Sequence, residues 1–131
     1  MAHAHLPHDH GQKIEQLLSR IPSAADFQNL AETFQLLSDG SRLRLFWLLC
    51  HCEECVTNLS AIMGMSSPAI SHHLRLLKSA GLITSRREGK EVYYTAQDNP
   101  TAQTLHDALE SLMAITCPIE WKNGLTKGDT P

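Results

Sequence analysis

Three cysteines stand close together in residues 48–59, which read LLCHCEECVTNL. Thiolates are soft ligands for Zn(II), Cd(II), Pb(II) and As(III), so Cys50, Cys52 and Cys55 indicate a metal site. Cys52 and Cys55 are three residues apart, a spacing at which two thiols on one helical edge chelate one ion. Cys50 also fits the buried face of the preceding helix, so packing in the core is the alternative to metal binding for this thiol.

A thiol-redox or persulfide switch is the second chemistry that these residues allow. The chain has one more cysteine, Cys117, which could pair with a thiol of the cluster, and two clustered thiols could also pair with each other. Redox sensors need a low thiol pKa, however, and the neighbouring acidic Glu53 and Glu54 act in the opposite direction. The sequence therefore favours metal binding over redox chemistry.

The composition limits where this chemistry takes place. The chain has 131 residues and 42% hydrophobic residues, enough for the core of one domain. No apolar run approaches the roughly 20 residues that span a membrane, and the N-terminus lacks the layout of a secretory signal. We expect a cytoplasmic protein without a membrane partner, in which thiols stay reduced and clustered cysteines serve metal or redox chemistry rather than structural disulfides.

Positive charge is concentrated in one part of the chain. The net charge is −3, yet residues 66–95 hold five cations against two carboxylates, a balance of +3, which leaves −6 for the remainder. A localised basic surface on an acidic body is typical of a protein that contacts phosphates. The alternative is a solvated basic face without a partner.

Periodicity and capping residues predict the elements that position these groups. Residues 1–11, MAHAHLPHDHG, have no apolar periodicity and are expected to be a flexible His-rich tail, and residues 119–131 a second tail. Between them, residues 12–118 form the predicted domain. Its expected helices cover residues 12–20, 23–37, 41–50, 56–63, 67–79 and 98–118, with Ser23, Ser41 and Ser67 as caps. Two β-prone runs, 82–86 and 91–95, flank the turn 87–90 and predict a hairpin.

Two short helices with a glycine-containing turn, followed by a basic hairpin, predict a mainly helical winged helix-turn-helix. In such a unit the second helix enters the major groove of double-stranded DNA and the hairpin contacts flanking phosphates or the minor groove. The candidate DNA contacts are Ser66, Ser67, Ser71, His72 and Arg75 on the helix and Arg86, Arg87 and Lys90 on the hairpin. No serine or cysteine follows a strand-to-helix elbow, so we do not expect an enzyme.

Three motifs resemble the ArsR/SmtB family of metal-responsive repressors. They are LLSDGSRLRL at 36–45, SSPAISHHLRLL at 66–77 and the hairpin from GLI at 81–83 through REGK at 87–90 to the tyrosines at 93 and 94. The resemblance covers about residues 25–115. It implies a homodimer, formed by the first and last helices, that represses an operator and releases it when an inducer binds.

The resemblance also bears on the thiols. The family's motif ELCVCDL matches Cys55 as its first cysteine, whereas Thr57 and Asn58 replace its second cysteine and its aspartate. Cys52 would therefore take over the missing role. In the cadmium-sensing branch an N-terminal arm of the other subunit completes the site. Here that arm offers His8 and His10 above all, with further donors at His3, His5 and Asp9, a set that suits Zn(II).

The family's second sensing site, on its last helix, is not present as such. Asp98 matches its first ligand, but Pro100, Ser111 and Ala114 take the other ligand positions. An alternative set follows one face of the last helix at i, i+4, i+7 and i+11, namely His106, Glu110, Met113 and Cys117. Metal binding by His106, Glu110 and Cys117 across the dimer is one interpretation, and interface packing is the other.

Overall fold

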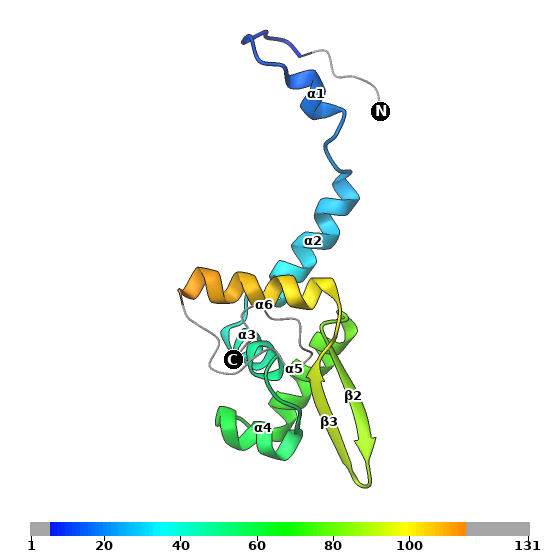
Figure 1. Cartoon of the computed structure of the whole chain (residues 1–131), viewed down its shortest axis with the longest axis vertical. Helices are drawn as coiled ribbons and strands as arrows, with labels where there is room; N and C mark the ends of the chain where they lie inside the picture. Colours follow the sequence, from blue (N-terminus) through cyan, green and yellow to red (C-terminus); the bar gives the residue numbers. More distant parts are fainter. Residues whose placement is uncertain (1–5, 115–131) are drawn as a thin grey trace, which may run out of the picture. The chain divides into compact units, whose positions relative to one another are not determined.

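The computed structural model describes residues 6–114. They belong to two compact units, Met1–Phe34 and Gln35–Pro131, which are treated separately below. The elements in chain order are α1 (Ile14–Leu18), α2 (Ala24–Leu36), α3 (Gly40–Leu49), β1 (Glu54–Cys55), α4 (Val56–Met63), α5 (Ser67–Ser79), β2 (Ile83–Glu88), β3 (Glu91–Ala96) and α6 (Pro100–Met113) (Figure 1). This is the predicted mainly helical fold with a β-hairpin wing.

The first unit holds α1 and most of α2. Helix α1 is shorter at both ends than the predicted 12–20, and the Lys13 side chain makes no capping hydrogen bond at its start. Helix α2 begins after Ser23 as predicted: the Asp26 N–H donates to Ser23 Oγ at 3.1 Å and the Ser23 N–H donates to the Asp26 carboxylate at 3.3 Å. Its apolar residues Phe27, Leu30 and Phe34 are each more than half exposed.

The second unit is built around a core to which each of its described helices and strands contributes. The fully buried side chains include Leu45, Phe46 and Leu49 of α3, Leu59 of α4, Ile70, Leu74 and Leu77 of α5, Leu82 and Ile83 at the start of the hairpin, and His106 of α6. The spacing of Leu43, Phe46, Trp47 and Cys50 at i, i+3, i+4 and i+7 predicts one buried face of α3. That prediction is partly wrong, since Leu43 and Trp47 are only half-buried. Helix α3 is apolar on several sides, so periodicity alone could not select the face that packs.

Two predicted helix caps are displaced. Helix α3 is capped by Asp39, whose carboxylate accepts the Arg42 N–H at 2.9 Å, and not by Ser41. Helix α5 is capped by Ser66, whose Oγ accepts the Ala69 N–H at 3.2 Å, and not by Ser67. In both cases the side chain of the capping residue accepts a hydrogen bond from the N–H three residues later. The capping residue, whose backbone is extended, lies one or two residues before the predicted serine.

The hairpin is longer than predicted and belongs to a three-stranded antiparallel sheet with the order β1-β3-β2. Strands β2 and β3 pair from Ile83 opposite Ala96 to Glu88 opposite Glu91, so the turn has two residues rather than four. Gly89 takes a positive φ of 63° there, as tight hairpin turns require. Strand β1 was not predicted because it has only two residues, which pair with Tyr93 and Tyr94 of β3.

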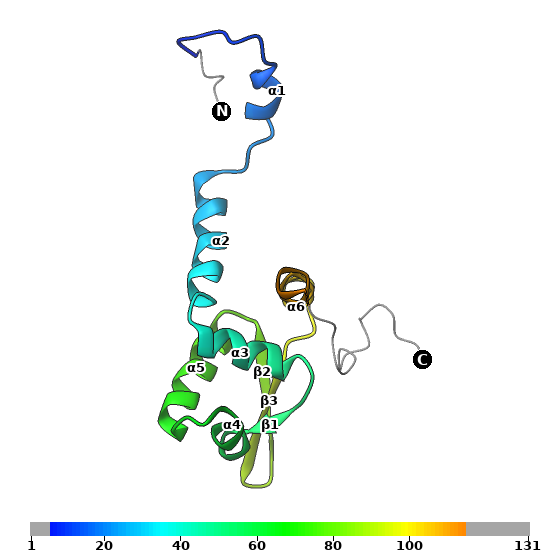
Figure 2. The same ribbon diagram turned by 90° about the vertical axis from the view of Figure 1, so that its left-hand side faces the viewer.

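Helix α6 starts where Asn99 caps it, with the Asn99 side chain accepting the Ala102 N–H at 2.8 Å. It ends at Met113, before the predicted 117–118, because Ala114 adopts a left-handed conformation. Figure 2 shows α6 nearly end-on. One face is buried through Ala102 and His106, whereas Leu112 is 85% exposed. Within the described range, no helix is long and apolar enough to cross a membrane.

Candidate functional site

The exposed face of α5 carries every helical residue predicted to contact DNA. Ser66, Ser67, Ser71, His72 and Arg75 are exposed, while Ile70, His73, Leu74 and Leu77 point into the core. We call these five exposed residues, which the sequence predicts to contact DNA, the DNA-reading face. One contact lies within it, because an Arg75 guanidinium nitrogen is 3.0 Å from Nδ1 of His72. The face offers hydroxyls, one imidazole and one guanidinium, which are groups that read base edges and hold phosphates.

The three predicted cations of the wing have different surroundings. Arg86, Arg87 and Lys90 are all exposed. The Arg86 guanidinium donates two hydrogen bonds to Glu53, at 2.8 and 2.9 Å, and one to Glu88 at 2.7 Å. It also lies 5.0 Å from the ring centroid of Tyr93. These carboxylates raise the pKa of Arg86. Their hydrogen bonds engage the guanidinium group that the sequence predicts to contact DNA.

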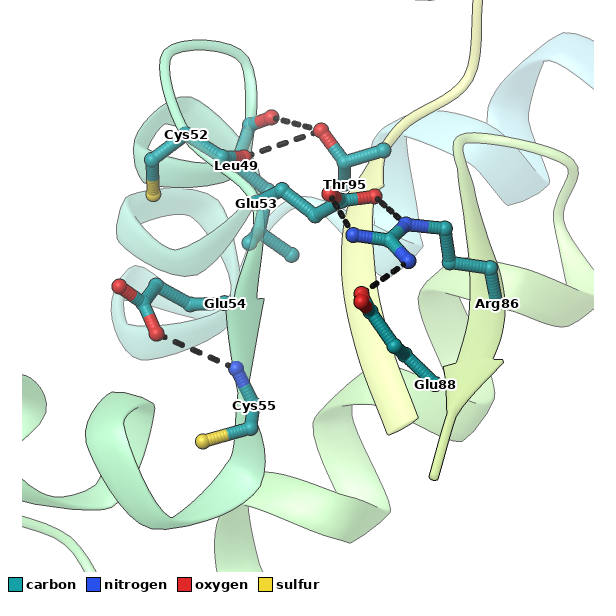
Figure 3. A network of polar contacts seen from close by, with 8 residues as sticks. All are labelled: Leu49, Cys52, Glu53, Glu54, Cys55, Arg86, Glu88 and Thr95. Carbon is teal, nitrogen blue, oxygen red and sulfur yellow. Dashed lines mark hydrogen bonds and ion pairs between the residues drawn. The ribbon is translucent and has the colours of Figure 1, made fainter. Parts of the chain in front are cut away.

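The thiols of residues 50–55, called the thiol segment below, have three different environments. Cys50 is fully buried in the core, and Cys55 is buried at the start of α4. Cys52 is half-buried, with Sγ 3.4 Å from the Leu48 carbonyl oxygen. In Figure 3 the sulfur atoms of Cys52 and Cys55 lie apart. No group of three metal-ligand atoms in the described residues includes a cysteine, so these thiols do not already form a three-ligand site.

Burial is the first cause of a raised pKa for the Cys52 thiol, and the nearby charge of Glu54 is the second. This direction agrees with the expectation that acidic neighbours disfavour a reactive thiolate. Glu54 accepts the Cys55 N–H at 3.3 Å and the Asn58 side-chain N–H at 2.8 Å. Cys117, the predicted partner in the redox alternative, lies outside the described residues.

The thiol segment is bonded directly to the wing (Figure 3). The buried Thr95 hydroxyl on β3 lies 2.9 Å from the Cys52 carbonyl oxygen and 3.2 Å from that of Leu49. On the other strand, Arg86 of β2 holds Glu53. The contacts of Glu53 and Thr95 were not predicted from the sequence, because their partners lie 33 to 46 positions away.

The remaining predicted ligands lie in two places. His8 and His10, with ring centroids 5.8 Å apart, belong to the first unit, and their relation to the thiol segment is not defined. His106 and Glu110 are neighbours on α6, and the third member of their predicted set, Cys117, is outside the described residues. The structure places His51 beside them instead.

A second missed network joins α3 to α5. The Arg42 Nε donates to the Leu36 carbonyl oxygen at 2.6 Å, and its Nη1 is 3.2 Å from Nδ1 of His73. Burial lowers the pKa of His73, so its ring is neutral near pH 7. Arg42 is part of the motif at 36–45, but only the fold shows that its side chain contacts His73 of α5.

Comparisons with known proteins agree with this geometry. The model of the family described as "Bacterial regulatory protein, arsR family" matches residues 39–85. The chain is 38% identical over 103 residues to a transcriptional repressor SmtB homolog of Synechocystis. The aligned part covers 79% of this chain and 78% of that protein. The chain belongs to the arsR family. It is also 38% identical over 81 residues to a cadmium resistance transcriptional regulatory protein CadC homolog of Staphylococcus aureus, covering 61% and 67% of the two chains.

The fold comparison leads to the same family. A solution structure of a homodimeric winged helix-turn-helix DNA-binding domain from Mycobacterium bovis, a possible ArsR-family regulator, matches with a TM-score of 0.60. It is 29% identical and covers 82% of this chain and 92% of that one. The predicted family and winged helix-turn-helix are thereby confirmed. As a member of the arsR family the chain is a transcriptional regulator and not an enzyme.

Proposed function

We propose that this arsR-family regulator is a homodimeric repressor that leaves its operator when a thiophilic metal ion binds at Cys52 and Cys55. The DNA-reading face and the wing cations Arg87 and Lys90 would hold the operator. The inducer would be Zn(II) or a softer ion such as Cd(II), Pb(II) or As(III), in keeping with thiolate ligands. The relative described as a cadmium resistance regulator supports this class of inducer.

One observation carries the proposal: the thiol segment and the wing form one bonded unit. Thr95 bonds the carbonyl of Cys52, Arg86 bonds Glu53, and Cys55 pairs with Tyr93 across the sheet. An ion that draws the Cys52 and Cys55 sulfur atoms together must move the backbone between them. Because that backbone is tied to both strands of the hairpin, the wing moves too, and its contacts to DNA weaken. Cys50 contributes to the core, so its role as a third ligand is the less supported one.

The two thiols do not complete a coordination shell, which needs three or four ligands. We propose His8 and His10 from the N-terminal tail as the remaining donors, because a dimer can bring one subunit's tail to the other subunit's thiols. The exposed apolar residues of α2 and α6 support dimerisation, and so does the homodimeric relative from Mycobacterium bovis.

Operator binding with and without metal tests the proposal. Adding one equivalent of the inducing ion should lower the affinity for operator DNA about tenfold or more, within the usual range of allosteric coupling. The Cys52→Ser and Cys55→Ser variants should bind the operator normally and stay bound when metal is added. Thr57→Ala, an exposed change two residues after Cys55, is the matched control and should respond like the unmodified chain. Release by polysulfide or peroxide but by no metal would contradict the proposal.

The coupling route can be tested separately from ligand binding. Thr95→Val keeps the shape of the side chain but removes the hydrogen bonds to Leu49 and Cys52. Metal should still bind this variant with one ion per site, as measured by titration, yet release less of the bound operator. Full release in Thr95→Val would show that the signal does not travel through β3.

A further inference from the structure

A second group of metal-ligand atoms lies in the described residues, and it contains no cysteine. The side chains of His51, His106 and Glu110 place their donor atoms within 4.8 Å of one another. His106 and Glu110 are four residues apart on α6 and so share one helix face. His51 comes from the turn that follows α3, in the thiol segment. Two elements far apart in sequence therefore bring three donors to one point.

The distances suit coordination of a single ion. Nε2 of His106 is 3.3 Å from Nε2 of His51 and 3.2 Å from a carboxylate oxygen of Glu110. In a tetrahedral site with bonds of about 2.0–2.1 Å, neighbouring ligand atoms are about 3.4 Å apart. Two of the three pairs already have this separation. The third pair, at no more than 4.8 Å, needs only a side-chain adjustment.

The polarity of the group calls for a cation at its centre. Asp107 Oδ1 lies 3.0 Å from Nδ1 of His106, the position from which an outer carboxylate orients a metal-binding imidazole. When the ring proton is on Nδ1, the Nε2 lone pair faces the group. The Glu110 oxygen beside that lone pair is buried and accepts no hydrogen bond within the described part of the chain. In that tautomer Nε2 and the Glu110 oxygen are two acceptors 3.2 Å apart, and a cation between them would remove their repulsion.

The burial of the three side chains and their apolar neighbours suit a bound metal ion. His106 is 1% exposed, whereas His51 and Glu110 are half-buried and leave a route for an ion. The Trp47 ring lies 4.6 Å from the His51 ring and shields it. Trp47 also lines an apolar pocket of about 370 Å³ together with Leu109. Apolar side chains next to the proposed ligands favour coordination by limiting the contact of water with the ion on that side.

We propose that His51, His106 and Glu110 bind one borderline divalent cation, with Zn(II) as the ion that two imidazoles and a carboxylate suit best. The ion links the end of α3 to α6. This site is separate from the thiols of the proposed function, and neither proposal depends on the other. Because His51 adjoins Cys52, occupancy here would also fix one end of the thiol segment.

Cobalt(II) is the probe, because its visible spectrum reports geometry and thiolate ligands add a charge-transfer band. The experiment uses the full chain with Cys52→Ser, Cys55→Ser, Cys117→Ser and the four tail histidines replaced by glutamine, so that of the other candidate ligands only Asp9 and the buried Cys50 remain. One equivalent of Co(II) should give the d–d absorption of a four-coordinate ion without a thiolate band. It should also raise the melting temperature.

Added to that background, Glu110→Gln and His51→Gln should each weaken cobalt binding at least tenfold. Glu91→Gln, the same chemical change at an exposed wing position, should leave it unchanged. His106→Gln should abolish binding, and circular dichroism shows whether this buried variant folds. If it does not fold, Glu110→Gln and His51→Gln decide the question. Absence of cobalt binding in the background chain, or undiminished binding in those two variants, would overturn the proposal. Operator release is not measured, so the thiol proposal stands or falls independently.

Discussion

Arg86 and Arg87 are neighbours on β2, yet their guanidinium groups have different surroundings. Arg86 is held by Glu53, Glu88 and the ring of Tyr93. Arg87 is exposed and has no ion pair among the described residues. A cation already paired with two carboxylates has less charge to offer a phosphate, so the two positions, equivalent in the sequence, are not equivalent in the folded wing.

Replacing these arginines one at a time should therefore give different results. Arg87→Ala should weaken operator binding about equally for all DNA sequences and lower the slope of log affinity against log salt by about 1, since one phosphate contact is lost. Arg86→Ala should change that slope much less. Fluorescence anisotropy titrations over a range of salt concentrations measure both. An equal loss of slope in the two variants would assign Arg86 to DNA after all.

His73 predicts a pH dependence of stability. Burial lowers the pKa of His73 below its usual 6.5, so the unfolded chain takes up a proton more readily than the folded one. The stabilisation by neutral His73 is complete above pH 6.5 and is lost as the pH falls through the lowered folded pKa. Urea unfolding should show lower stability at pH 5 than at pH 7, and His73→Gln should reduce that difference. A difference of the same size in His73→Gln would contradict this origin.

At the scale of elements, the start of α5 combines two tasks. Ser66 caps the helix, and the adjacent Ser67 is exposed in its first turn beside Pro68. A capping hydrogen bond stabilises a helix with or without DNA. A serine that only contacts phosphate affects the affinity for DNA and not the stability of the free protein. The two serines of the motif SSP can thus be separated by a stability measurement.

Ser66→Ala should lower the free energy of unfolding by about 1 kcal/mol, the usual value for a lost N-cap. Ser67→Ala should change it by less than about 0.5 kcal/mol, as expected for an exposed side chain. Urea denaturation of the DNA-free protein measures both variants. Equal effects would mean that the Ser66 hydroxyl does not cap α5 in solution.

At the scale of the whole molecule, exposed apolar side chains support the proposed homodimer. The apolar side chains of Phe27 on α2 and Leu112 on α6 are 51% and 85% exposed to water. The two helices are those through which the dimer was predicted to form. Their apolar surface is what such an interface buries.

Phe27→Ser and Leu112→Ser should each raise the dimer dissociation constant at least about tenfold, because each removes a large buried side chain from both copies. Sedimentation equilibrium measures the constant, and operator affinity should fall with it. Ile62→Ser, at an exposed apolar residue of α4, is the control and should leave the dimer intact. A stable dimer in both test variants would place the interface elsewhere.

The amino-acid sequence by itself determined the family, the winged helix-turn-helix and which side of α5 faces outward. These properties depend on spacings of three or four residues and on capping side chains, and both act locally. The same local signals misplaced the caps of α3 and α5 by one or two residues, because Asp39 and Ser41, or Ser66 and Ser67, can each fill the position.

Only the tertiary structure decided which distant side chains meet. Glu53 and Arg86 are 33 residues apart, and His51 and His106 are 55 apart, so no periodicity connects them. The cysteine spacing suggested one compact site, but packing buries Cys50 in the core and bonds the segment to the wing instead. Likewise His106, predicted with Cys117, meets His51. The pairing of β1 with β3 positions the turn after α3, which holds His51, and the packing of α6 on the core positions His106.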